Sequence, residues 1–159
     1  MNLISMKHAK IAAVAAAALA VTGVVPVATA PHAAAATGCS GKLIESRSLK
    51  VGKTIVGSMA IYYNAATGVN CAKTNHGGVT WNKKAYTLIE IYSCRNRTPG
   101  RNCDMDKHAI NSGNFKQYAG PVSVNAKGRC IAVHANIWWK GDATAYSGGY
   151  RSLITTHCG

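Results

Sequence analysis

Acidic side chains, which most hydrolases need as proton donors or nucleophiles, are scarce in this sequence. Lys and Arg number 18, against only 5 Asp and Glu. A glycosidase needs two carboxylates. Those available are Glu45, Glu90, Asp104, Asp106 and Asp142. Glu90 interrupts the run Tyr86-x-Leu88-x-Glu90-x-Tyr92, and strand alternation predicts that this face points to solvent while Ile89 and Ile91 point inward. The alternative is a functional carboxylate at Glu90.

Nucleophilic, phosphate-directed and metal chemistry find no matching motif. No Gly-x-Ser-x-Gly elbow is present for a seryl nucleophile. A ribonuclease would gather His, Glu and cations around a phosphate, but no spacing selects a set from His76, His108, His134 and His157. No His-x-x-x-His occurs, and Asp104-x-Asp106 lacks the other ligands of a calcium loop. We therefore expect a protein that is not an enzyme and holds no metal or cofactor.

The best candidate for ligand binding is the stretch 130–139. If Ile131, Val133, Ala135, Ile137 and Trp139 face a core, a period of two places Ala132, His134, Asn136 and Trp138 on the opposite face. An exposed Trp138 beside His134 and Asn136, followed by Lys140, could stack on a sugar ring or a base. The alternative is that a second sheet or a loop covers Trp138.

The formal net charge of +13 predicts an anionic partner. The cations are spread along the chain, and the densest stretch runs from Arg95 through Arg97 and Arg101 to Lys107. A charge of this size attracts many polyanions and is weakened by salt. We expect binding to anionic cell-wall or spore-surface polymers, with non-specific binding to nucleic acid possible.

Residues 1–36 have the pattern of a secretory signal peptide. Lys7, His8 and Lys10 precede an apolar run, and small residues lead to a predicted cleavage site after Ala36. The run is shorter than the roughly 20 apolar residues of a membrane span, so we expect no membrane anchor. A lipoprotein signal before Cys39 is the alternative. The remaining residues 37–159, with net charge +11, are predicted to form a single secreted domain, a monomer.

The six cysteines of the chain predict a disulfide framework, since an even count in a small exported domain is typical of one. Cys94 and Cys103 bracket a polar Pro-Gly turn and are expected to pair. Cys39, Cys71, Cys130 and Cys158 then have three possible pairings. Our expectation among these is Cys39 with Cys71 and Cys130 with Cys158.

The hydrophobic period is closer to two than to 3.6, which predicts an all-β fold. Two hairpins are expected, one over 55–63 and 69–74 with residues 55, 59, 61 and 63 on one face, the other over 121–125 and 130–139. Further strands are predicted at 85–93, 144–146 and 152–156, with a turn at 147–149, while 104–111 could be a short helix. About eight strands indicate a compact antiparallel sandwich or barrel stabilised by disulfides. Gly120 and Pro121 are expected to set a strand entry.

Two stretches resemble the spore-associated protein A family of secreted actinobacterial proteins. They are Tyr62-Tyr63-Asn64-Ala65-Ala66-Thr67-Gly68-Val69-Asn70-Cys71 and the run from Asn111 to Val122 that continues in Ala126-Lys127-Gly128-Arg129-Cys130; the ending His157-Cys158-Gly159 also fits. The resemblance implies an exported four-cysteine protein found with spores or the cell exterior, with no catalytic residue to carry over. Its four cysteines match Cys39, Cys71, Cys130 and Cys158. This chain differs by adding Cys94 and Cys103 and by its strong basic charge.

The sequence therefore predicts a non-catalytic secreted protein on the spore surface or cell wall, bound to anionic material through its charge. Two other classes remain open. A small secreted enzyme such as a ribonuclease would require Glu90 and a His to converge in one cleft. A secreted inhibitor or toxin would use a rigid exposed loop, for which the Arg95–Arg101 turn between Cys94 and Cys103 is the candidate.

Overall fold

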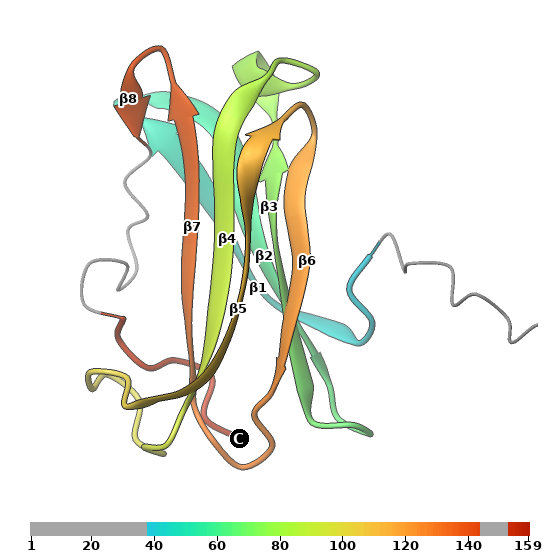
Figure 1. Cartoon of the computed structure of the whole chain (residues 1–159), viewed down its shortest axis with the longest axis vertical. Helices are drawn as coiled ribbons and strands as arrows, with labels where there is room; N and C mark the ends of the chain where they lie inside the picture. The colour runs from blue at the N-terminus through green and yellow to red at the C-terminus, as the bar shows by residue number, and fades with distance from the viewer. Residues whose placement is uncertain (1–37, 144–152) are drawn as a thin grey trace, which may run out of the picture. The chain divides into compact units, whose positions relative to one another are not determined.

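Two antiparallel four-stranded sheets face each other in the computed structural model, which describes residues 38–143 and 153–159 (Figure 1). In order across the first sheet the strands are β1 (Lys42–Val51), β2 (Thr54–Asn64), β3 (Val69–His76) and β6 (Tyr118–Asn125). In order across the second they are β5 (Met105–Phe115), β4 (Ala85–Cys94), β7 (Ile131–Trp139) and β8 (Asp142–Ala143). This arrangement confirms the predicted all-β, sandwich-like class. The predicted leader, 1–36, lies outside the described residues.

Between β3 and β4 the chain makes one turn of 3-10 helix, η1 (Gly78–Thr80). Within the described ranges, no helix has the length and apolar character needed to cross a membrane.

Strand alternation buries one face of each sheet in a shared core between them. On β4, Ile89 and Ile91 are fully buried, as predicted, while Glu90 points to the outer face. The other buried members of the core are Leu49, Val56, Met59, Ile61, Ala72, Ala85, Ala119, Val122, Val124, Ala126, Ile131, Val133, Ala135 and Ile137. Trp139 packs against this cluster from its rim. The predicted inward face of 131–139 is therefore confirmed.

The hairpin of β2 and β3 forms as predicted, with Asn64 paired to Val69. The Asn64 side chain closes its turn by accepting hydrogen bonds from the amides of Ala66 (3.1 Å) and Thr67 (3.3 Å). Such Asx contacts substitute for main-chain partners in a turn.

One inward position on β2 was predicted wrongly. Ile55 is 50% exposed, whereas Val56 is fully buried. The β1–β2 register steps from the Leu49–Gly57 pair to the Lys50–Ile55 pair, which leaves Val56 as an extra residue. A bulge of this kind shifts the alternation by one position.

The short helix predicted over 104–111 is wrong, because that segment belongs to strand β5. β5 pairs with β4 along its length, from Ala85–Phe115 to Cys94–Met105. It is an edge strand with one face only half-buried, so its sequence carries little apolar alternation. Pairing with β4 supplies the main-chain hydrogen bonds, and this tertiary contact overrides a weak local preference.

The hairpin predicted over 121–125 and 130–139 is also wrong. β6 pairs with β3 and β7 pairs with β4, so the connection between them crosses from one sheet to the other. Both strands carry buried apolar residues that face the same core. The alternation of buried and exposed residues is the same whether the two strands pair in one hairpin or lie in two facing sheets. It therefore could not distinguish the two arrangements.

The last predicted strands are only partly covered by the described residues. The strand at 144–146 and the turn at 147–149 lie outside them. Within the part of 152–156 that is described, Ile154 and Thr156 make isolated bridges to Asn102 and Ile131 instead of a continuous strand.

The connections leave the sandwich at two chemically different ends (Figure 1). One end, called here the tryptophan end, comprises the segments 50–55, 77–86, 115–118 and 138–141. The other, the disulfide end, comprises 39–42, 64–71, 94–104, 126–131 and 153–159. All three disulfides involve this second end, and the pairs are Cys39–Cys71, Cys94–Cys103 and Cys130–Cys158, as expected from the sequence.

Gly120 holds β6 close to both neighbouring layers. Its φ is 94°, and a Cβ there would lie 2.9 Å from the carbonyl oxygen of Ala72 and 3.2 Å from Cγ2 of Ile89. Its amide donates to Oδ1 of Asn111 at 2.9 Å, which links β6 to β5. Only glycine fits this backbone and this spacing.

Replacing Gly120 with Ala should lower the free energy of unfolding by about 2–3 kcal/mol, since left-handed strain and a clash with main chain add together. Gly52 is the control, because its φ is also positive (56°) but a methyl group added to it would meet no atom within 4 Å. Gly52→Ala should cost only about 1 kcal/mol. Urea unfolding with the disulfides intact measures both variants. Equal losses of unfolding free energy would show that the close contacts around Gly120 add nothing to the cost.

Candidate functional site

All three tryptophans of the chain lie at the tryptophan end. Trp81 directly follows η1 and is 53% exposed. Trp138 and Trp139 close β7; Trp138 is 49% exposed and Trp139 is half-buried against the core. Single exposed apolar side chains are common, but several at one end of a protein often mark an interaction surface, so this end is a candidate site.

Lysines surround these rings. Six exposed lysines belong to the segments of the tryptophan end: Lys50, Lys53, Lys83, Lys84, Lys116 and Lys140. The same segments contain no acidic residue. The next acid in the chain is Asp142 on β8, whose backbone pairs with that of Trp139 on β7. The six lysines of these segments therefore have one acidic residue, Asp142, directly beside them in the chain.

A hollow of about 340 Å³ opens at this end beside Trp139 and two of the lysines. It is lined by Val51, Thr54, Val79, Lys83, Trp139 and Lys140. The Lys83 ammonium lies 5.5 Å from the centroid of the Trp139 ring, a cation–π distance. An apolar wall with two cations on it suits a ring-bearing anionic group.

Trp138 is held in place without being covered. Its Nε1 donates to the carbonyl oxygen of Gly141 at 3.2 Å, and its ring meets Tyr86 edge-on, with centroids 6.5 Å apart and planes at 76°. The β7–β8 turn thus fixes one edge of the indole. Among the described residues, no sheet or loop covers Trp138, which is 49% exposed.

His134 and Asn136 lie on the outer face of β7, as strand alternation predicts. Each is half-buried, and they stand opposite Glu90 and Leu88 of β4. Nδ1 of His134 is 3.6 Å from a carboxylate oxygen of Glu90. Burial lowers the pKa of His134 to about 4, even with this carboxylate nearby. At neutral pH the ring is therefore uncharged.

The Glu90–His134 contact is the convergence that an enzyme would require. A neutral imidazole beside a carboxylate can accept a proton. The two side chains are largely covered, with 12% of His134 and 15% of Glu90 exposed. Among the described residues, neither lines the hollow beside Trp139 or the one at the disulfide end.

The arginines that the sequence singled out lie at the other end of the sandwich. Arg95 donates to Asp104 at 2.8 Å and to the Met105 carbonyl at 2.8 Å, and Asp106 is 3.7 Å from it. Arg129 also contacts Asp106. Carboxylates therefore offset part of the positive charge here, while Arg97 and Arg101 remain exposed. The structure brings Trp138 and Lys140 together but separates them from this loop.

Two contributors to the tryptophan end were missed in the sequence, Trp81 and Lys83. A signal for them exists, since the pattern Trp-x-Lys occurs in Trp81-Asn82-Lys83 and again in Trp138-Trp139-Lys140. The two copies lie on different strand connections, and only the sandwich brings them to one end. The central residue of the first copy, Asn82, has a positive φ of 58°.

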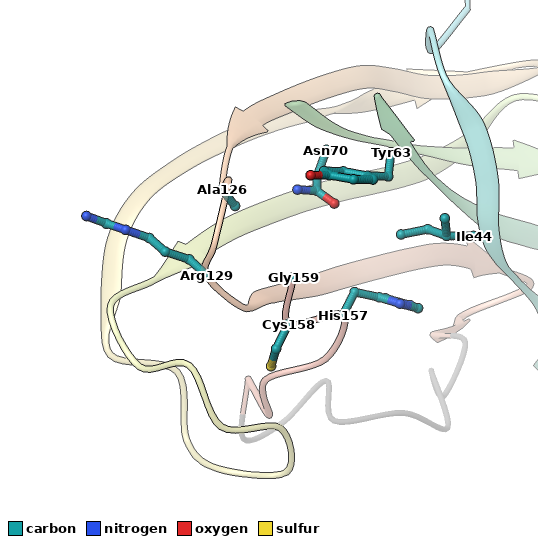
Figure 2. A pocket seen from close by; sticks show the side chains of 8 residues that line it. All are labelled: Ile44, Tyr63, Asn70, Ala126, Arg129, His157, Cys158 and Gly159. Atoms are coloured by element: carbon teal, nitrogen blue, oxygen red, sulfur yellow. The ribbon is translucent and has the colours of Figure 1, made fainter. Parts of the chain in front are cut away.

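A second, smaller hollow of about 190 Å³ lies at the disulfide end (Figure 2). It is lined by Ile44, Tyr63, Asn70, Ala126, Arg129, His157, Cys158 and Gly159. Tyr63 and Asn70 lie side by side on one wall, while Arg129 extends away from it (Figure 2). Of its polar lining residues, Arg129 contacts Asp106 and His157 contacts Glu45.

Nε2 of His157, beside this hollow, lies 2.6 Å from the Glu45 carboxylate, which also contacts Arg47. Burial by itself raises the pKa of the Glu45 carboxyl, but the hydrogen bonds and charges of Arg47 and His157 outweigh it, so that the pKa is lowered. The contact joins β1 to the C-terminal segment. In the part of the chain that the structure describes, no three His, Cys, Asp or Glu side chains gather as a metal site would require.

Comparison with known proteins shows a distant relative. Over 112 residues, the chain is 30% identical to Spore-associated protein A of Streptomyces coelicolor. The match spans 65% of this chain and 64% of that protein, so the chain aligns with somewhat less than two thirds of its relative's length. No family model matches the chain, and no solved structure does so either.

Acid should destabilise the fold through His134. Its pKa is lower in the folded protein (about 4) than in the unfolded chain (about 6.5). The free energy of unfolding is therefore highest above pH 6.5 and falls as the pH drops toward 4. Between pH 7.5 and pH 5 this loss should be at most about 2 kcal/mol, since solvent screens part of the effect. His134→Asn should remove that part of the pH dependence in urea unfolding at the two pH values. An unchanged pH dependence in the variant would contradict the assignment.

Proposed function

We propose that this protein is a non-catalytic, exported component of the spore surface or cell envelope that binds an anionic polymer through its tryptophan end. The observation that carries this proposal is the gathering of three tryptophans and six lysines at the end that holds the hollow beside Trp139. The name of its distant relative, Spore-associated protein A, supports the location.

The composition of the tryptophan end favours a polymer that carries both rings and negative charge. Lysines attract phosphate or carboxylate groups from a distance, and salt screens that attraction. Exposed rings such as Trp81 and Trp138 stack on sugar or base faces once contact is made. An anionic envelope glycan offers both features. Nucleic acid offers them too, and on this proposal it binds without sequence preference.

The charge distribution favours the tryptophan end over the arginine loop that the sequence suggested. Of the cations at the disulfide end, Arg95 and Arg129 contact Asp104 and Asp106. The tryptophan-end segments have six exposed lysines, and the one acid next to them in the chain is Asp142. A polyanion should therefore contact this end first.

Export fits the covalent structure. Three disulfides pair all six cysteines, and such bridges persist in oxidising compartments outside the cytosol. The predicted leader over 1–36 would deliver the chain there.

The absence of catalysis in this proposal follows from how the carboxylates are used. Glu45 contacts Arg47 and His157, Glu90 lies beside His134, and Asp104 and Asp106 contact arginines. Each acid whose side chain is described is thus engaged by a basic partner. None of them stands in the hollow at the tryptophan end.

Reversing two charges at the tryptophan end should weaken attachment. We expect Lys83→Glu with Lys140→Glu to reduce binding to purified Streptomyces spores and cell walls by about tenfold at low salt, since two cationic contacts become repulsive. The matched control is Lys42→Glu with Lys127→Glu, which changes the net charge equally at the disulfide end. Sedimentation binding across a salt series measures both. Equal losses in the two variants, or wild-type binding that salt does not weaken, would contradict the proposal.

Removing the Trp138 ring tests stacking separately from charge. Trp138→Ala should cost about tenfold in binding to the polymer that the lysines recognise, the usual value of one stacked ring. Met105→Ala is the control, because Met105 is exposed to the same degree (50% against 49%) at the disulfide end. Unchanged binding of Trp138→Ala to spores, walls and DNA would remove Trp138 from the site.

A further inference from the structure

The loop between Cys94 and Cys103 displays one arginine with an unoccupied main chain. Arg97 is exposed, and within the described residues neither its amide nor its carbonyl makes a hydrogen bond. Arg95 and Arg101 differ from it. The Arg95 side chain is held by Asp104, and the Arg101 carbonyl accepts from the Thr155 amide at 2.8 Å. Of the three arginines, only Arg97 is free to pair with another protein through both main chain and side chain.

The C-terminal segment braces this loop from behind. Thr155 is 2% exposed, and its hydroxyl donates to the carbonyl oxygen of Thr98 at 2.7 Å and accepts from the Arg101 amide at 3.1 Å. The Gly100 amide donates to the Thr155 carbonyl at 2.9 Å. One buried threonine therefore fixes the residues on the C-terminal side of Arg97.

The N-terminal side of Arg97 is braced within the loop itself. The side chain of Asn96 donates to the Asn102 carbonyl at 2.9 Å and accepts from the Asp104 amide at 3.1 Å. Beyond it, the Cys94–Cys103 disulfide closes the base of the loop. Arg97 thus projects from a segment held on both sides, with its own peptide groups left open.

We propose that this loop is an inhibitory loop for serine proteases that cleave after basic residues, with Arg97 entering the acidic specificity pocket. Such proteases select a basic side chain through a buried Asp and align the peptide by main-chain hydrogen bonds. Arg97 supplies the side chain and the open main chain. A loop already held in one conformation loses little entropy on binding, which favours a tight complex.

The bracing also explains why the protease would be inhibited instead of simply cutting the loop. Hydrolysis of the Arg97–Thr98 bond consumes one water and leaves a carboxylate on Arg97 and an amine on Thr98. The disulfide, Asn96 and Thr155 hold both new ends in place. The ends then stay in the protease cleft, product release is slow, and the same bond can re-form.

This inference is independent of the proposed envelope attachment, because the loop lies at the disulfide end and the lysines lie at the tryptophan end (Figure 1). Either can fail alone. A protein bound to a polymer through the tryptophan end would leave the Arg97 loop accessible.

The test is inhibition of trypsin by the mature, disulfide-intact protein. We expect tight inhibition, with slow cleavage restricted to the Arg97–Thr98 bond by mass spectrometry. Arg97→Ala should raise the inhibition constant by about 100-fold, as for a central interface residue. Arg101→Ala, the matched control in the same loop, should leave it within about threefold. Rapid complete cleavage, inhibition that Arg97→Ala leaves intact, or no inhibition at all would overturn the proposal.

Two further variants distinguish recognition from a general effect on folding. Arg97→Leu alters only an exposed side chain and should move inhibition from trypsin to chymotrypsin, whose pocket is apolar. Thr155→Val should keep binding but accelerate cleavage of Arg97–Thr98 by about tenfold, since the Thr98 carbonyl loses its brace. Failure of Arg97→Leu to inhibit chymotrypsin would count against the pocket assignment.

Discussion

The packing of two sheets against one narrow aliphatic core determines where chemistry can occur in this protein. β4 and β7 send Ile89, Ile91 and Ile137 into that core, and the other wall supplies Met59 and Ile61. Every strand that contributes to the core has only its other face and its ends left for polar groups. The connections and strand ends therefore carry most of the exposed cations and all three tryptophans, and strand order decides which of them meet.

The two ends of the sandwich are stabilised differently. At the disulfide end, three bridges and the Thr155 contacts hold the connections covalently and through buried hydrogen bonds. A bridge in a domain of this size contributes about 2–4 kcal/mol, mainly by restricting the unfolded chain. The tryptophan end has no bridge and is held by buried hydrogen bonds, in which the His76 ring contacts the Thr87 hydroxyl at 2.6 Å and the Thr80 carbonyl at 3.1 Å. The disulfide end is therefore fixed covalently, whereas the tryptophan end is fixed by non-covalent contacts alone.

Strand alternation made much of the fold predictable, because it depends only on neighbouring residues. It placed Ile89 and Ile91 inside and His134, Asn136 and Trp138 outside, and the structure agrees. It failed where partners distant in sequence decide the outcome. β5 exists through its pairing with β4, and β6 and β7 separate because alternation does not distinguish one sheet from two facing sheets. The same reason explains the site. Trp138 was predicted from alternation along one strand, whereas Trp81 was missed because only the connection from β3 to β4 brings it to the tryptophan end.

The position of the three tryptophans has a spectroscopic consequence. Indole dominates the near-ultraviolet emission of a protein, and here every indole lies at one end of the sandwich. Two of the rings are about half exposed, and the third lies beside the Lys83 ammonium. The intrinsic fluorescence of this protein is therefore a local probe. It reports occupancy and solvation of the tryptophan end without a label, and it is nearly silent about opening of the disulfide end.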